Sequence, residues 1–199
     1  MNTIYHFNIA DWQIQLNFAH ENEITGMHLL PSFAPFTTET SEGNLLLTMI
    51  IDQAWVPEDT VKHIKVCDTG NGDILVEKTA DEGYSFVIRN LRGEDCAIMQ
   101  SSQDFTMCRC KVFGEREEQH CFGLNNAMMM AYAFAGAVHN TLLVHASVVR
   151  HEGMGYAFIA KSGTGKSTQT QNWLKTIPNC DLMNDDNPVV RTVNGEVWI

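Results

Sequence analysis

The sequence predicts an α/β protein, α+β overall, with a β-rich antiparallel half over residues 1–120 and a core of helices and strands over residues 121–199. Three observations support this prediction. Short runs of alternating apolar and polar residues, separated by turn residues, fill the first half. A segment rich in Ala and Met then marks a change of pattern. An apolar strand follows it and leads through a glycine-containing loop into a helix.

The first half is expected to be a meander of short antiparallel strands. Trp12–Phe18 alternates apolar and polar residues at every position, and Tyr5, Phe7 and Ile9 alternate just before it, so the two runs predict a hairpin. Leu45–Ile51 is a more continuous apolar run, which is typical of a strand covered on both faces. The remaining predicted strands are Val61–Cys67, Ile74–Thr79, Tyr84–Arg89, Cys96–Ser101 and Phe105–Val112.

The second half is expected to alternate helices and strands. Asn125–Asn140 is apolar nearly all round, which predicts a buried helix. Leu142–Arg150 and Tyr156–Ala160 are predicted strands. A helix is expected from Lys166 to Thr176, followed by the strand Asp181–Asp186, which ends in two carboxylates. A fold of this kind normally needs more strands, so we expect the chain to be part of a longer protein.

Composition narrows the function classes. The net charge of −11 argues against nucleic acid or an anionic membrane as a partner. No basic and apolar leader opens the chain, and the longest apolar run, 127–138, is too short to cross a bilayer. Six cysteines without framework spacing fit reduced thiols. These features predict a cytoplasmic protein.

The most informative motif follows the strand Tyr156–Ala160. Ala160-x-x-x-x-Gly165-Lys166-Ser167 is a phosphate-binding loop of the Walker A type, with Ala in place of the usual first glycine. Such a loop turns backbone N–H groups toward phosphate oxygens, and the helix that follows points its positive end at them. Lys166 is expected to reach the β- and γ-phosphates of ATP, and Ser167 to contact Mg²⁺. The expected nucleotide-binding residues are Ser162, Gly163, Thr164, Gly165, Lys166, Ser167 and Thr168.

Two acids and a histidine complete the candidate site. Asp185 and Asp186 follow the helix and a strand, where one carboxylate could hold Mg²⁺ and the other could accept a proton from an attacking hydroxyl. A solvated turn is the alternative, because Asp and Asn favour turns. Alternation places His145 and Ser147 on one strand face, although a lone histidine there is more often a core residue.

Together these motifs resemble the catalytic domain of HPr kinase/phosphorylase. The resemblance rests on His145–Val149, Gly155–Ala160, Lys161–Thr168 and Asn184–Val190, and it covers about 55 residues. It implies that Lys166 and Ser167 serve ATP and Mg²⁺. It also implies that Asp185 and Asp186 supply a metal contact and a general base, and that His145 lies near the phosphates. The family has further catalytic residues downstream, and residues 1–120 match none of its domains.

The predicted function is therefore that of an ATP-dependent kinase acting on a hydroxyl of an unidentified protein or small molecule. Catalytic roles fall to Asp185, Asp186, His145 and Lys166, and the metal ligands are Ser167 and Asp185. A nucleotide sensor or scaffold without turnover is the alternative. The HPr kinase family shares its core with ATP-dependent phosphoenolpyruvate carboxykinases, so carboxykinase chemistry is a third and less favoured alternative. That reaction needs a second metal shell, and the sequence does not show one. A homo-oligomer is left open.

A zinc site at Cys108, Cys110, His120 and Cys121 is disfavoured, because the paired spacing of structural zinc ligands is missing.

Overall fold

The computed structural model describes residues 3–20, 26–39 and 43–199, which form two compact units. The first unit is Met1–Ala135 and the second is Gly136–Ile199. The division falls near the end of the long helix over Glu117–Ala137, because most of that helix lies within the first unit.

The predicted α/β fold class is wrong. The protein is mostly β, with 47% strand and 20% helix, and every strand pair in the second unit is antiparallel. Parallel strands require a long crossover connection, usually a helix. Between the two strands before the glycine loop the chain instead makes a tight turn, in which Glu152 and Gly153 have left-handed φ values of 51° and 77°. The loop therefore follows the second strand of a hairpin, and no α/β P-loop core is formed.

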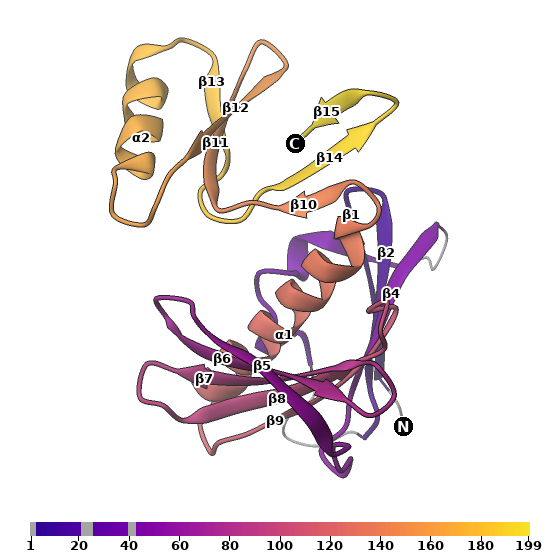
Figure 1. The fold of residues 1–199 in the computed structure, drawn as a ribbon. Coiled ribbons are helices and arrows are strands. Elements are labelled where there is room, and N and C mark those ends of the chain that lie inside the picture. Colours follow the sequence, from indigo (N-terminus) through magenta and orange to yellow (C-terminus); the bar gives the residue numbers. More distant parts are fainter. Residues whose placement is uncertain (1–2, 21–25, 40–42) are drawn as a thin grey trace. The chain divides into compact units, whose positions relative to one another are not determined.

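The first unit is built on a mixed sheet with the strand order β3-β1-β2-β4-β9-β8-β7-β6-β5 (Figure 1). Its strands are β1 (Thr3–Ile9), β2 (Trp12–Phe18), β3 (Thr37–Thr38), β4 (Asn44–Ile51), β5 (Thr60–Asp68), β6 (Gly72–Thr79), β7 (Tyr84–Asn90), β8 (Asp95–Ser101) and β9 (Met107–Val112). Two short 3₁₀ turns, η1 (Met27–Leu29) and η2 (Ala34–Phe36), precede β3.

The expectation of a purely antiparallel first half is also wrong at one strand. β5 to β9 form the predicted antiparallel meander, and β1 pairs with β2 as a hairpin. β4, however, lies between β2 and β9 and is parallel to both. Its side chains are buried from Leu46 to Met49, as expected for a strand in the middle of a sheet.

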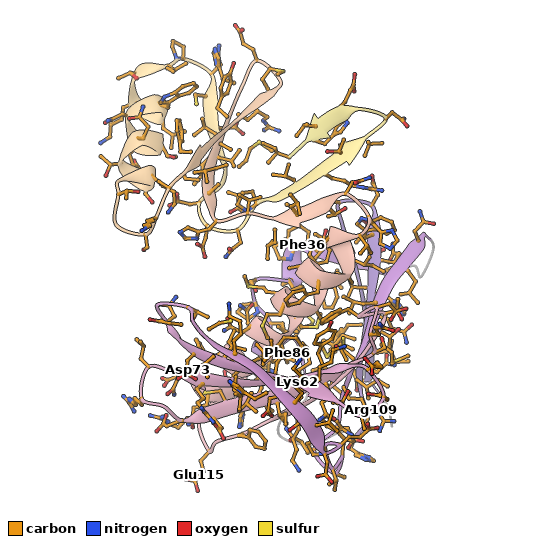
Figure 2. All side chains as sticks on the ribbon, viewed as in Figure 1. Phe36, Lys62, Asp73, Phe86, Arg109 and Glu115 are labelled. Atoms are coloured by element: carbon orange, nitrogen blue, oxygen red, sulfur yellow. The ribbon has the colours of Figure 1, made fainter. Side chains whose placement is uncertain are left out.

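The long helix α1 (Glu117–Ala137) packs on one face of this sheet (Figure 1). It begins earlier than predicted, and only one face is buried. Its buried residues recur at helical spacing, namely Leu124, Ala127, Met128, Ala131, Tyr132 and Ala135. Phe134 is 47% exposed, although its ring lies 5.8 Å from that of Phe86, which Figure 2 shows between the sheet and the helix. The helix is therefore half-buried rather than buried all round.

Gly123 sets how closely α1 approaches β8. A Cβ atom at this position would lie 2.4 Å from the carbonyl oxygen of Cys96, and backbone cannot move aside as a side chain can. We expect Gly123→Ala to lower the free energy of unfolding by about 1–3 kcal/mol, as overpacking does. The opposing gain in helix propensity is only about 1 kcal/mol. Urea denaturation followed by circular dichroism measures the change.

Gly136→Ala is the matched control in the same helix, because a Cβ there meets its nearest atom, the oxygen of Thr141, at 3.2 Å. Equal stability of the Gly123→Ala and wild-type proteins would contradict the close approach.

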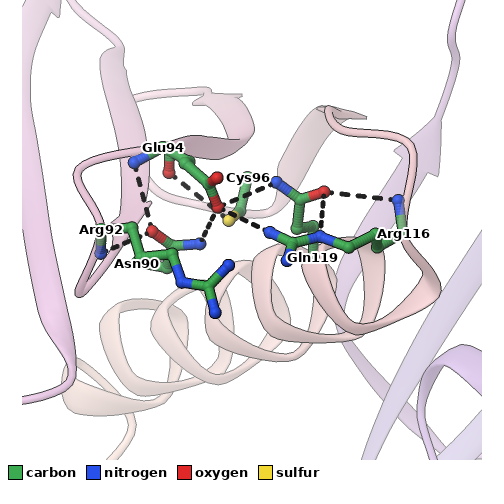
Figure 3. A network of polar contacts seen from close by, with 6 residues as sticks. All are labelled: Asn90, Arg92, Glu94, Cys96, Arg116 and Gln119. Carbon is green, nitrogen blue, oxygen red and sulfur yellow. Dashed lines mark hydrogen bonds and ion pairs between the residues drawn. The ribbon is translucent and has the colours of Figure 1, made fainter.

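A polar network fastens the β7–β8 turn to the start of α1 (Figure 3). The Glu94 carboxylate accepts hydrogen bonds from Asn90 Nδ2 at 2.7 Å, Arg116 Nη2 at 2.8 Å and Gln119 Nε2 at 3.2 Å. The Asn90 side-chain oxygen in turn accepts the backbone N–H groups of Arg92 and Glu94. The hydrogen bond from Asn90, followed by the charge of Arg116, lowers the pKa of Glu94 below its usual 4.5.

This network predicts a pH-dependent stability. Because the pKa of Glu94 is lower in the folded state, its contribution is complete above pH 4.5 and is lost as the pH falls through the folded-state pKa. We expect Glu94→Gln to be less stable than wild type at neutral pH, and the difference to shrink in acid. Urea midpoints measured across this range test it, and a difference that does not vary with pH would contradict it.

The second unit consists of two small antiparallel sheets and one helix. Its elements are β10 (Thr141–Leu143), β11 (Ala146–His151), β12 (Met154–Ile159), α2 (Lys166–Thr176), β13 (Cys180–Asn184), β14 (Val189–Val193) and β15 (Glu196–Trp198). One sheet has the order β12-β11-β13 and the other β10-β14-β15. The predicted strand Leu142–Arg150 is thus divided between two sheets, with His145 in the break.

Helix α2 packs on the first of these sheets. The Trp173 ring lies 4.9 Å from that of Tyr156 and 5.5 Å from that of Phe158, both on β12. In the part of the chain that the structure describes, neither helix has the length and apolar character needed to cross a membrane.

Candidate functional site

The glycine loop joins β12 to α2 in the second unit. Gly163 and Gly165 have φ values of 78° and 97°, which lie in the left-handed region. An anion-binding nest forms where a residue in the right-handed helical conformation adjoins one in the left-handed conformation, because their successive N–H groups then point the same way. Gly163 and Gly165 supply the left-handed conformation. Gly165 also caps α2, and no side chain caps this helix end through a hydrogen bond. The amides of the first turn are therefore not used by a capping side chain.

The Lys166 ammonium group lies among three protein acceptors. Its Nζ atom is 2.8 Å from His145 Nε2, 3.0 Å from the carbonyl oxygen of Ala160 and 3.5 Å from that of Lys161. An ammonium group has three hydrogens to donate. All three have a partner within the protein, so a phosphate must replace some of these contacts to bind Lys166.

The break between β10 and β11 places His145 beside Asp186. On either side of the histidine, Val144 N donates to Pro188 O and Ala146 N donates to Asp186 O, both at 3.0 Å. His145 Nδ1 lies 3.3 Å from Asp186 Oδ1. Because the ammonium of Lys166 can only donate, His145 Nε2 must accept, and the proton of a neutral ring is then on Nδ1, facing the carboxylate.

The Asp185 carboxylate contacts the Ser147 hydroxyl, which in turn contacts the Thr170 hydroxyl. Ser147 Oγ on β11 lies 2.5 Å from Asp185 Oδ1 and 2.5 Å from Thr170 Oγ1 on α2. Ser147 is 0% exposed and Thr170 is 1% exposed. By contrast, the side chains of His145 and Asp186 are 50% and 71% exposed.

Two rows of contacts therefore lead from α2 to the acids, one through His145 just before β11 and one through Ser147 on β11. The outer row is Lys166, His145 and Asp186, and the inner row is Thr170, Ser147 and Asp185. The spacings are similar, because two residues of extended chain, His145 to Ser147, span about 6.6 Å, and four helix residues, Lys166 to Thr170, rise about 6 Å. A helix packed along a strand can thus repeat one pairing one turn further along.

The structure brings some of the predicted site residues together and leaves others apart. Lys166, His145 and Asp186 form one row, and Asp185 belongs to the next. The side chains of Ser162, Thr164, Ser167 and Thr168 are exposed, and Thr164 Oγ1 donates to Lys161 O at 2.7 Å. Thr170 was missed, and its only sequence signal is its position one helical turn after Lys166.

Among residues 3–20, 26–39 and 43–199, no group of three or more His, Cys, Asp or Glu could hold a metal ion. Mg²⁺ usually binds through one or two carboxylates together with substrate phosphates and water. Asp185 and Ser167 are the residues expected to supply such donors, and Asp185 belongs to no group of metal-ligating side chains in these ranges.

Two of the three cysteines considered for a zinc site, Cys108 and Cys110, are core thiols. Cys108 and Cys110 are both fully buried on β9. Burial raises the pKa of Cys108 to about 12 and also raises the pKa of Cys110. Zinc binds thiolates, and these two groups stay protonated at neutral pH.

Comparisons with known protein families, with curated proteins and with solved structures found no match to this chain.

Proposed function

We propose that this protein is an ATP-dependent kinase that transfers the γ-phosphoryl group of ATP to a hydroxyl group. The observation that carries the proposal is the outer row of contacts. It connects the lysine of a phosphate-binding loop, through a single imidazole, to a carboxylate from a segment about twenty residues away. Phosphoryl transfer needs this combination, with positive charge at the phosphates and a proton acceptor beside the attacking hydroxyl.

Each residue has a defined part in this reaction. Lys166 binds the β- and γ-phosphate oxygens, and the loop amides bind the same groups. Ser167 and Asp185 would hold Mg²⁺, and the ion would neutralise phosphate charge. Asp186 accepts the proton of the attacking hydroxyl while the oxygen of that hydroxyl bonds to the γ-phosphorus. The bond from that phosphorus to the bridging oxygen breaks, and ADP leaves.

His145 connects the two ends of the outer row. It accepts from Lys166 through Nε2 and faces Asp186 through Nδ1. When phosphate takes the ammonium group of Lys166, Nε2 loses its donor, and the imidazole is free to turn. His145 thus couples occupancy of the loop to the environment of Asp186.

The acceptor is a protein or small molecule that carries a hydroxyl group. We place the reaction in the cytoplasm, because it consumes ATP and the six cysteines are free thiols.

The test is transfer from γ-labelled ATP with Mg²⁺ present, measured as labelled phosphate, protein or small molecule. Release of ADP that depends on the protein supports the kinase. Tight binding of ATP without release of ADP in the presence of candidate acceptors would instead support a nucleotide sensor. One observation favours the sensor: both oxygens of Asp186 have protein neighbours, since Asn187 Nδ2 donates to Oδ2 at 2.8 Å.

A further inference from the structure

We propose that Thr170 and Ser147 are positioning residues that fix the Asp185 carboxylate for magnesium. The inference rests on the proposed function and assigns work to two hydroxyl groups that the loop motif does not include. It starts from the inner row of contacts, in which a helix hydroxyl, a strand hydroxyl and an acid follow one another at 2.5 Å spacing.

The hydrogen bonds of the inner row run in one direction. An ionised carboxylate can only accept, so Ser147 donates its hydroxyl proton to Asp185. The Ser147 oxygen can then accept the proton of Thr170. Each donation strengthens the next in such a chain, so both hydroxyl groups direct their hydrogen bonds toward Asp185.

Burial makes this row the rigid one. Ser147 and Thr170 are almost completely buried, so neither hydroxyl can exchange its partner for water. A buried hydroxyl without a partner costs free energy, and this favours the arrangement in which Asp185 completes the chain. Asp185 itself is exposed and would otherwise lose rotamer freedom when it binds a metal.

The hydrogen bond leaves Asp185 able to bind a cation. A carboxylate has about four lone-pair positions, and Ser147 occupies one of them on Oδ1. The other positions stay open on the exposed side of the residue. A fixed carboxylate with open lone pairs is what a metal ligand requires, and groups that orient such ligands commonly affect metal affinity tenfold or more.

The experiment measures metal binding rather than turnover. Mn²⁺, in place of Mg²⁺, is titrated into the ATP complex and followed by electron paramagnetic resonance. We expect Thr170→Val, which keeps the shape and removes the hydroxyl, to weaken Mn²⁺ binding roughly tenfold. ATP affinity without metal should be unchanged. Thr170→Ser, which restores the hydroxyl, should bind Mn²⁺ nearly as wild type does.

Thr176→Val in the last turn of α2 is the matched control, since its hydroxyl donates to Asn172 O, and it should leave Mn²⁺ affinity unchanged. Equal Mn²⁺ affinity of wild type and Thr170→Val would overturn the inference while leaving the kinase proposal standing. Parallel losses in both Thr170 variants, with metal-free ATP binding lost as well, would show a structural role only and would also overturn it. A wild-type protein that binds no ATP would remove the proposed function and this inference together.

Discussion

Lys166→Ala is expected to reduce ATP affinity roughly a hundredfold or more, which corresponds to about 2.7 kcal/mol or above. The ammonium group lies within the loop, 3.0 Å from Ala160 O, and it is the cation that the proposed ATP site would use to bind phosphate. Hydrogen bonds to charged groups contribute about 1.5–3 kcal/mol each, and a lysine at this position makes more than one. Isothermal titration calorimetry with ATP measures the loss.

Lys175→Ala tests whether any loss of charge on α2 has the same effect. Lys175 lies in the last turn of the same helix, at the end away from the loop. Its replacement should leave ATP affinity within about twofold of wild type, because surface charges at that distance are screened by salt. ATP affinity that is the same in Lys166→Ala and wild type would remove the loop from the site.

Asp186→Asn is expected to leave ATP binding intact and to lower the rate of phosphoryl transfer by about 10²–10⁴-fold, the usual contribution of a general base. An amide has the shape of a carboxylate and retains an oxygen to face His145, so the loop and the outer row should persist. It cannot take up a proton at neutral pH. ATP affinity and the transfer rate are measured on the same preparation.

Asp181→Asn is the matched control, because Asp181 is an acid on β13 that pairs with Arg150 at 2.6 Å and has no contact with the outer row. The loss of an exposed ion pair should change stability little, because solvent screens it, and it should not change transfer. Normal transfer by Asp186→Asn would exclude it as the base.

Local structure could be predicted from this sequence where one face of an element is buried. β2 has the predicted bounds, Trp12–Phe18, because strict alternation identifies a strand. Alternation does not reveal strand direction, and for that reason the parallel pairing of β4 was missed. Direction depends on which strands meet in space, and β4 meets two strands from distant parts of the chain.

The class of the second unit was missed for a similar reason. A strand, a glycine loop and a helix fit both a parallel and an antiparallel sheet. The turn at Glu152 and Gly153 decides between them, because so short a connection can join only antiparallel strands. The loop itself could be identified, because Gly165, Lys166 and Ser167 stand next to one another in the sequence.

The rows of contacts required the structure. Alternation places Ser147 and His145 on the same face. No sequence pattern shows that Asp185 contacts Ser147 and that Asp186 contacts His145. Thr170 has no distinguishing feature among the polar residues of α2 until its burial is known.

His145 lies where the chain leaves the sheet of β10 and enters the sheet of β11. Lys166 belongs to α2, which packs on the sheet of β11. A change in the angle between the two sheets would therefore alter the separation of His145 Nε2 and Lys166 Nζ. The nuclear magnetic resonance signals of the His145 imidazole would therefore report a change in the angle between these two sheets.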